Sequence, residues 1–223
     1  MKKILFTLIA LVLSVGSYAQ LIANKTDKKV TFSGDLFTDF QLKANDNWDA
    51  RGINQGFSWA VTYNFPLGES KVHTVSLGLG MTTKNYFSYS VIQNPYSTDT
   101  LIFAQMRDED GFKRYKVNPF YFDVPLEMRF RIKDAWKIGV GFKFGVRFTT
   151  KTRYVGYDEN GTSIDELELG IPNMERFAYS ATLRVGYKWF NLFSAIQLNR
   201  VFEVGHEAPY FIPLSVGFTL APF

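Results

Sequence analysis

The chain has 223 residues, which is enough for one domain with a large buried surface and does not require a second. It contains no cysteine, which excludes disulfides, thiolate metal sites, cysteine nucleophiles and a lipidated N-terminal cysteine. The formal net charge is +4 and there is no long run of Lys or Arg, so nucleic acid is not expected as a partner. The chain has 22 Phe and 12 Tyr at a mean hydropathy of -0.08, which favours strands over a bundle of membrane helices.

Residues 1–19 have the pattern of a secretory signal peptide. Lysines precede an apolar stretch over 4–15, and small residues follow at Ser17 and Ala19. The apolar stretch is too short to span a bilayer, which takes about 20 apolar residues. We therefore expect cleavage before Gln20 and a mature domain over 20–223; the alternative is a retained membrane anchor.

The mature part shows an alternation of large apolar residues with small or polar ones. It has no run of roughly 18 apolar residues that would suit a membrane helix, so any membrane insertion must use strands. The alternation is clearest from Trp136, where Trp136, Ile138 and Val140 share one face and Lys137, Gly139 and Gly141 the other. Similar patterns predict about eight antiparallel strands in all, near 32–42, 57–65, 74–82, 122–130, 136–149, 177–189, 192–202 and 212–220.

The connections between these strands alternate in length. Those at 66–71, 133–135 and Asn191 are short, whereas those at 43–56, 86–117 and 150–175 are long and the one at 203–209 is the shortest of the second set. Short periplasmic turns and long outer loops are typical of transmembrane up-and-down β-barrels with both termini in the periplasm.

The bulk of the two faces predicts which one points outward. Eight strands enclose a space just wide enough for side chains, and the face rich in Phe, Tyr, Trp and Leu is too bulky for it. Placing Lys137, Lys143, Arg147 and Arg184 against lipid instead would cost about 2–4 kcal/mol each near the midplane. We therefore expect lipid outside, with an aromatic girdle at the strand ends formed by Trp59, Trp136, Phe148, Phe177, Tyr179, Tyr187 and Trp189.

The segment 120–130 resembles one that is common in the PorT-like outer-membrane β-barrel families, small barrels of Gram-negative bacteria. It contains Phe122, Asp123, Pro125 and Leu126, and in those families an aromatic residue, an acidic residue and Pro-Leu recur early in a middle strand. The resemblance implies the outer membrane, and PorT-like proteins are linked to a protein-secretion system. Phe223 is interpreted as an assembly signal for the barrel-assembly machinery, although it is out of phase with the last outward residues.

Charged residues of both signs fall on the inward face. An unpaired buried charge costs several kcal/mol, roughly 3–5 when a partner is lost, so we expect these groups to pair and plug the lumen. Antiparallel pairing around the 133–135 turn predicts Glu127 and Asp123 near Lys143 and Arg147. The alternative is a proton or small-ion path. The predicted network comprises Asp35, Asp39, Asp123, Glu127, Arg129, Lys143, Arg147 and Arg184.

No catalytic or metal site is predicted, and no cofactor. The chain has two histidines, His73 near a periplasmic strand start and His206 beside Glu207 in the shortest outer loop. A Ser-His-acid site would need a serine near His206, which the sequence does not place, and neither histidine has a second ligand at metal-binding spacing. Acidic strings at 108–110 and 165–168 are interpreted as solvated loops.

These features favour a non-enzymatic outer-membrane barrel that presents loops 86–117 and 150–175 to an extracellular or secretion-system protein partner. The other expected partners are outer-membrane lipid and the barrel-assembly machinery. Two alternatives stay open: a lipid-modifying enzyme, of lipid A deacylase or acyltransferase type, with His206 at its rim, and a narrow pore.

Overall fold

The computed structural model describes residues 29–44, 46, 48–68, 73–92, 103–106, 111–132, 136–157, 161–171, 173–203 and 209–221. The predicted signal peptide, His206, Glu207, the acidic string 108–110 and Phe223 lie outside the described residues. No helix in the described ranges is long and apolar enough to cross a membrane.

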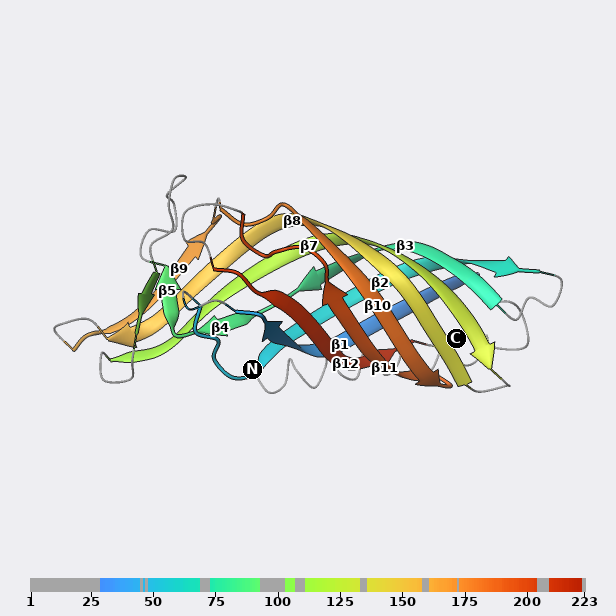
Figure 1. Ribbon diagram of the computed structural model, residues 1–223, viewed down its shortest axis with the longest axis horizontal. Coiled ribbons are helices and arrows are strands. Elements are labelled where there is room, and N and C mark those ends of the chain that lie inside the picture. The colour runs from blue at the N-terminus through green and yellow to red at the C-terminus, as the bar shows by residue number, and fades with distance from the viewer. Residues whose placement is uncertain are drawn as a thin grey trace, which may run out of the picture.

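Antiparallel strands close into a ring, in the order β1-β2-β3-β7-β8-β10-β11-β12 and back to β1 (Figure 1). This confirms the predicted all-β, up-and-down barrel of about eight strands. The ring strands are β1 Val30–Leu42, β2 Asn54–Leu67, β3 His73–Thr83, β7 Phe112–Ile132, β8 Trp136–Tyr157, β10 Phe177–Tyr187, β11 Phe190–Gln197 and β12 Ile212–Leu220.

The two faces of the ring strands differ as their alternation predicts. On β1, Phe32, Leu36 and Phe40 point outward and are exposed, whereas Asp35 and Asp39 between them are buried in the lumen. The same parity holds around the ring, so the outer wall is apolar and the lumen is lined mainly by polar and small residues. A Cβ added at Gly217 would stand 2.0 Å from the carbonyl oxygen of Leu36, so the close approach of β12 to β1 requires glycine there.

The predicted turn at Asn191 is shifted. Tyr187 pairs directly with Phe190, so the turn consists of Lys188, which has φ 55°, and Trp189. Asn191 instead lies in β11 and is buried facing the lumen, where its side chain fills the space left by Gly186.

The long outer loops contain more regular structure than the sequence analysis expected. β7 and β8 are 21 and 22 residues long and continue past the ring, and β4 Tyr86–Ser88 and β9 Ser163–Leu169 pair with their extended ends. The short strands β5 Ser90–Ile92 and β6 Phe103–Gln105 form a separate hairpin. Figure 1 shows β4, β5 and β9 gathered at one end of the molecule, around the extended ends of β7 and β8. We call this end the cap.

A β-bulge marks where the barrel wall becomes the cap. Phe120 pairs with Thr149 and Tyr121 with Arg147, which leaves Phe148 as the extra residue. Beyond this bulge the inward face of β7 carries Tyr115 and Val117, which join an apolar core, whereas Thr150 and Thr152 take the buried positions of β8.

Candidate functional site

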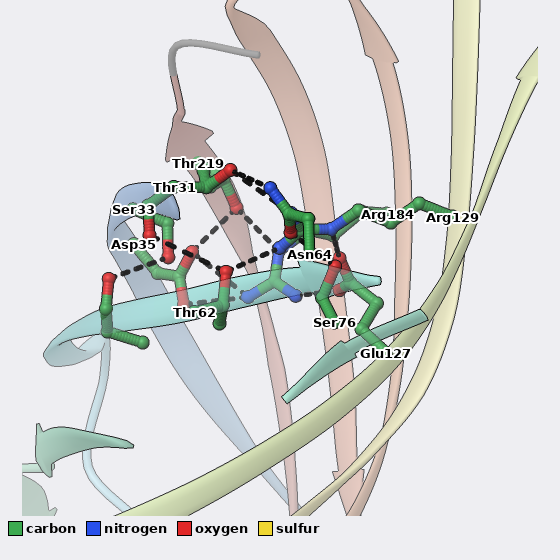
Figure 2. A network of polar contacts seen from close by, with 11 residues as sticks. Thr31, Ser33, Asp35, Thr62, Asn64, Ser76, Glu127, Arg129, Arg184 and Thr219 are labelled. Atoms are coloured by element: carbon green, nitrogen blue, oxygen red, sulfur yellow. Dashed lines mark hydrogen bonds and ion pairs between the residues drawn. The ribbon is translucent and has the colours of Figure 1, made fainter. Parts of the chain in front are cut away.

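Arg184 on β10 is the centre of a polar network inside the barrel (Figure 2). Its Nη2 lies 3.0 Å from an Asp35 carboxylate oxygen, its Nη1 bonds Glu127, and its Nε donates to Thr219 at 3.1 Å. These partners come from β1, β7 and β12, so one guanidinium links strands on several sides of the lumen. Asp35 also accepts hydrogen bonds from Thr219 at 2.6 Å and Ser58 at 2.7 Å.

Arg129 shares Glu127 with Arg184. Its Nε bonds the other carboxylate oxygen of Glu127, and its Nη1 donates to Asn64 at 2.9 Å. Asn64 in turn donates to Thr31 at 2.7 Å and accepts from Ser76 at 2.6 Å, which extends the network across β1, β2 and β3. The result is a connected set of buried, hydrogen-bonded charges rather than isolated ion pairs.

Smaller ion pairs lie nearer the cap. Lys143 Nζ is 3.5 Å from Asp123 and donates to Thr82 at 2.9 Å. Lys84 Nζ is 3.5 Å from Asp39, which also accepts a bond from Ser215. The Lys143–Asp123 pair joins β8 to β7, and the bond to Thr82 adds β3. The Lys84–Asp39 pair joins the residue after β3 to β1, two strands away in the ring.

The pairing differs in detail from the sequence-based expectation. Arg129 does lie opposite Gly139, but Glu127 lies opposite Gly141 and contacts Arg129 and Arg184 instead of Lys143. Arg147 does not reach Asp123; its guanidinium donates to Thr150 and to the backbone carbonyls of Ile171 and Met174. Register alone could not predict this, because the side chains cross the lumen and Arg147 lies where the wall becomes the cap.

Sequence analysis missed several lumen residues. Lys84 follows β3 and was assigned to no strand, yet it is buried against Asp39. Phe37 and Phe193 are aromatic residues on the inward face, with ring centroids 5.9 Å apart, and the Arg184 guanidinium stacks 4.8 Å over the Phe193 ring. The sequence did contain a signal for these two aromatic residues. Each follows an outward leucine on its own strand, so the alternation places it on the inward face.

The cap contains a hydrophobic core to which all the outer connections contribute. Trp48 comes from the β1–β2 connection, Tyr86 from β4, Met174 from the β8–β10 connection and Phe211 from the β11–β12 connection. Trp48 stacks on Phe211 with centroids 5.2 Å apart, and Tyr86 meets Phe211 edge-on at 5.1 Å. Because connections from around the ring converge in one core, they cover the outer end of the lumen. The core residues are Trp48, Tyr86, Val91, Ile92, Phe112, Tyr115, Val117, Ile171, Met174, Val201, Phe202 and Phe211.

Most residues of the predicted girdle lie near an end of the outer wall, whereas Trp59 lies within β2. Trp136 and Tyr187 pack together with centroids 5.5 Å apart at the turn end, beside exposed Trp189. Phe148 packs against Phe120 and Phe122 at the cap end. Phe177 and Tyr179 pack against Phe144 near the same end, and Trp59 stacks on Phe32.

The acidic string 165–168 belongs to β9 rather than to a solvated loop. Asp165 accepts two hydrogen bonds from Arg153, at 2.7 and 2.5 Å. Glu166 and Glu168 face the other way, where they line a pocket of about 320 Å³ together with Tyr115, Thr152 and Tyr154. Burial raises the pKa of the Tyr115 phenol, so this group stays neutral beside the pocket.

The histidine that the structure describes lies against an aromatic side chain. His73 packs against Phe130, with ring centroids 5.5 Å apart. Within the described ranges no group of three or more His, Cys, Asp or Glu residues is arranged to hold a metal ion.

Comparison with known proteins gives weak structural likenesses. The chain matches no known protein family and no curated protein. It is similar to Ail, the attachment invasion locus protein of Yersinia pestis, in a complex with the heparin analogue sucrose octasulfate, at 11% identity and a TM-score of 0.40 over 86% of this chain and 97% of Ail. A second Ail structure gives 12% identity and a TM-score of 0.36 over 86% and 97%. A mutant porin of Rh. blastica gives 7% identity and a TM-score of 0.21 over 86% and 99%. Values this low carry no argument about what this chain binds or does.

Proposed function

We propose that this chain is an integral outer-membrane β-barrel without enzymatic activity, whose cap presents a binding surface to an extracellular or secretion-system protein. One observation carries the membrane assignment: a closed ring of strands has its apolar side chains outward and its charged side chains inward. In water this arrangement would expose a continuous apolar wall, which soluble proteins avoid. In a bilayer the closed ring leaves no strand edge with unpaired backbone hydrogen-bonding groups, and the apolar wall faces lipid.

The lumen and cap support a barrel that does not conduct. Arg184 is buried and bonds both Glu127 and Asp35 across the interior, and the aromatic core of the cap covers one end. An ion path would require these groups to separate, and a separated buried charge is costly. We therefore favour a structural role for the network over the proton or small-ion path.

The cap supports a binding role because it is packed rather than loose. A preformed surface loses little conformational entropy when a partner binds. The pocket beside Glu166 and Glu168 gives the cap a recess with carboxylates at its edge, suited to a partner with a basic side chain. The resemblance of residues 120–130 to PorT-like barrels adds secretion machinery as the proposed setting.

The proposal includes export and assembly. Removal of residues 1–19 would give a mature protein beginning at Gln20, and Phe223 would be read by the barrel-assembly machinery. Mass spectrometry of the protein purified from membranes checks the first point, and an intact Met1 would contradict it.

A matched pair of substitutions tests the membrane assignment. Leu79 on β3 and Ile53 before β2 are each 71% exposed, but only Leu79 lies within the apolar wall. In a bilayer, Leu79→Arg should destabilise the barrel by about 2–4 kcal/mol, whereas Ile53→Arg should change stability by no more than about 0.5 kcal/mol. Urea midpoints of the protein folded into phospholipid vesicles measure both. Equal, small shifts for the two variants would contradict the proposal.

An assay separates this function from the enzymatic alternative. The purified protein is incubated with lipid A and phospholipid, and release or transfer of acyl chains is followed by mass spectrometry. We expect no turnover. An activity lost in His206→Ala, with assembly intact, would establish the lipid-modifying enzyme instead.

A further inference from the structure

The outward face of the wall changes character just beyond the bulge. At the bulge and on its barrel side, the aromatic side chains of Phe120, Phe122 and Phe148 pack together and end the apolar wall. On the cap side of the bulge, the outward positions of β7 and β8 carry cations. Thr150 and Thr152 take the buried positions of β8 there, so the residues that alternate with them point outward. We call these cations the basic patch: Arg114, Lys116, Lys151 and Arg153.

The strand register brings these like charges together. Lys116 lies directly opposite Arg153, and Lys151 lies opposite Asn118, two residue pairs closer to the bilayer. Side chains directly opposite on one face of antiparallel strands approach to about 5 Å between Cβ atoms, where like charges are destabilising. The pKa of Lys116 is lowered by partial burial and then by the charges of Arg114, Arg153 and Lys151.

The patch has little anionic compensation of its own. Arg153 pairs with Asp165, and Lys116 donates to the neutral side chain of Asn85 at 3.0 Å. Within the described part of the chain, Arg114 and Lys151 form no ion pair. Cations held together in this way are a favourable site for a polyanion that can bond several of them at once.

The height of the patch indicates which anion it meets. Lys151 is three residues beyond Phe148, and Lys116 is four residues from Phe120. At about 3.3 Å per residue and a strand tilt of about 40°, these cations stand roughly 8–10 Å above the edge of the apolar wall. The polar region of a leaflet begins at that edge and is about 5–8 Å thick, so the backbone of the patch stands at or just above its outer boundary, within reach of its Lys and Arg side chains.

Exposed leucines lie on the same face as the cations. Leu167 and Leu169 on β9 are 60% and 55% exposed and pair with Arg153 and Lys151. A soluble anion would gain nothing from these leucines, whereas an amphiphile has both an anionic group and an apolar body. This combination favours a lipid over a soluble polyanion.

We propose that the basic patch, with Leu167 and Leu169, binds the phosphate groups of a phosphorylated glycolipid in the outer leaflet. The inference rests on the proposed membrane location. Phosphates bridging Lys116 and Lys151 relieve the repulsion within the patch, and the leucines contact the body of the lipid. The bound lipid thereby fixes the cap relative to the membrane surface.

The test measures lipid binding to the folded protein in detergent micelles. Diphosphoryl lipid A is titrated and bound lipid is counted by native mass spectrometry, for the native protein and for the double variant Lys116→Gln/Lys151→Gln. The control, Lys43→Gln/Lys188→Gln, removes the same charge from exposed lysines outside the patch. We expect the patch variant to bind roughly tenfold more weakly or worse, and the control to bind within about twofold of native.

A second lipid separates phosphate recognition from apolar contact. Lipid A with both phosphates removed should bind the native protein as weakly as diphosphoryl lipid A binds the patch variant. Equal binding of the two lipids to native protein, or equal binding by the patch and control variants, would overturn the inference. Heat-dependent mobility in SDS and flotation with vesicles are measured in parallel. A protein that shows neither property overturns the membrane assignment. A protein that shows both but binds the two lipids equally overturns this inference alone.

Discussion

Glu127 is the carboxylate shared by Arg129 and Arg184, so its removal tests the lumen network directly. In Glu127→Ala, Arg184 keeps Asp35, and Arg129, whose side chain is 11% exposed, keeps its hydrogen bonds to the neutral acceptors Asn64 and Thr62. Breaking a buried pair on one side costs about 3–5 kcal/mol, and the neutral acceptors of Arg129 place the expected loss near the lower end. With an m-value of about 3 kcal/mol per molar urea, the unfolding midpoint should fall by about 1 M.

The assay is urea unfolding of the vesicle-embedded barrel, followed by tryptophan fluorescence. Glu166→Ala is the matched control, because Glu166 is an exposed glutamate of the cap that forms no ion pair among the described residues. Its loss should change stability by no more than about 0.5 kcal/mol. If Glu127→Ala leaves the midpoint where the control does, the network does not stabilise the barrel and the reasoning is refuted.

Two further predictions follow from the cap and the lumen. Trp48→Ala should loosen the cap core, since truncating a buried Trp costs about 3–5 kcal/mol. Trypsin should then cut the variant at Arg51 or Lys113 while the heat-resistant barrel persists. Cleavage unchanged from that of the native protein would contradict the role of Trp48. The native protein should give no stable channels in planar-bilayer recordings, because paired side chains fill the lumen of an eight-stranded barrel; stable conductance steps would contradict the closed interior.

The ring strands were predictable because a single rule, apolar outward and polar or small inward, holds at most of their positions, with Phe37 and Phe193 as inward exceptions. The rule fails beyond the bulge at Phe148, where one extra residue shifts the parity of β8 and the cap core makes the inward face apolar. A prediction based on that rule therefore stops near Phe122 and Thr149, although the strands continue. This reversal of polarity fits the proposed membrane location, in which the wall faces lipid and the cap stands in water.

The lumen residues were predictable in kind but not in pairing. Parity placed Asp35, Glu127 and Arg184 inside, but their contacts span β1, β7 and β10, which are not neighbours in the ring. Such contacts depend on barrel diameter and strand stagger, which alternation does not encode. Lys84 and Trp48 were missed for a related reason: each lies outside a ring strand, and its burial depends on how distant connections meet.

Site-directed fluorescence quenching tests the central claim most directly, and the absence of native cysteine lets one cysteine be introduced at a time. Probes are attached along β3 at Leu77 and Leu79, which point outward, and at Ser76 and Thr82, which point into the lumen. A quencher carried on lipid acyl chains should quench the outward probes strongly and the inward probes weakly. Uniform quenching, or strong quenching by a water-soluble quencher at Leu77 and Leu79, would contradict a lipid-facing wall.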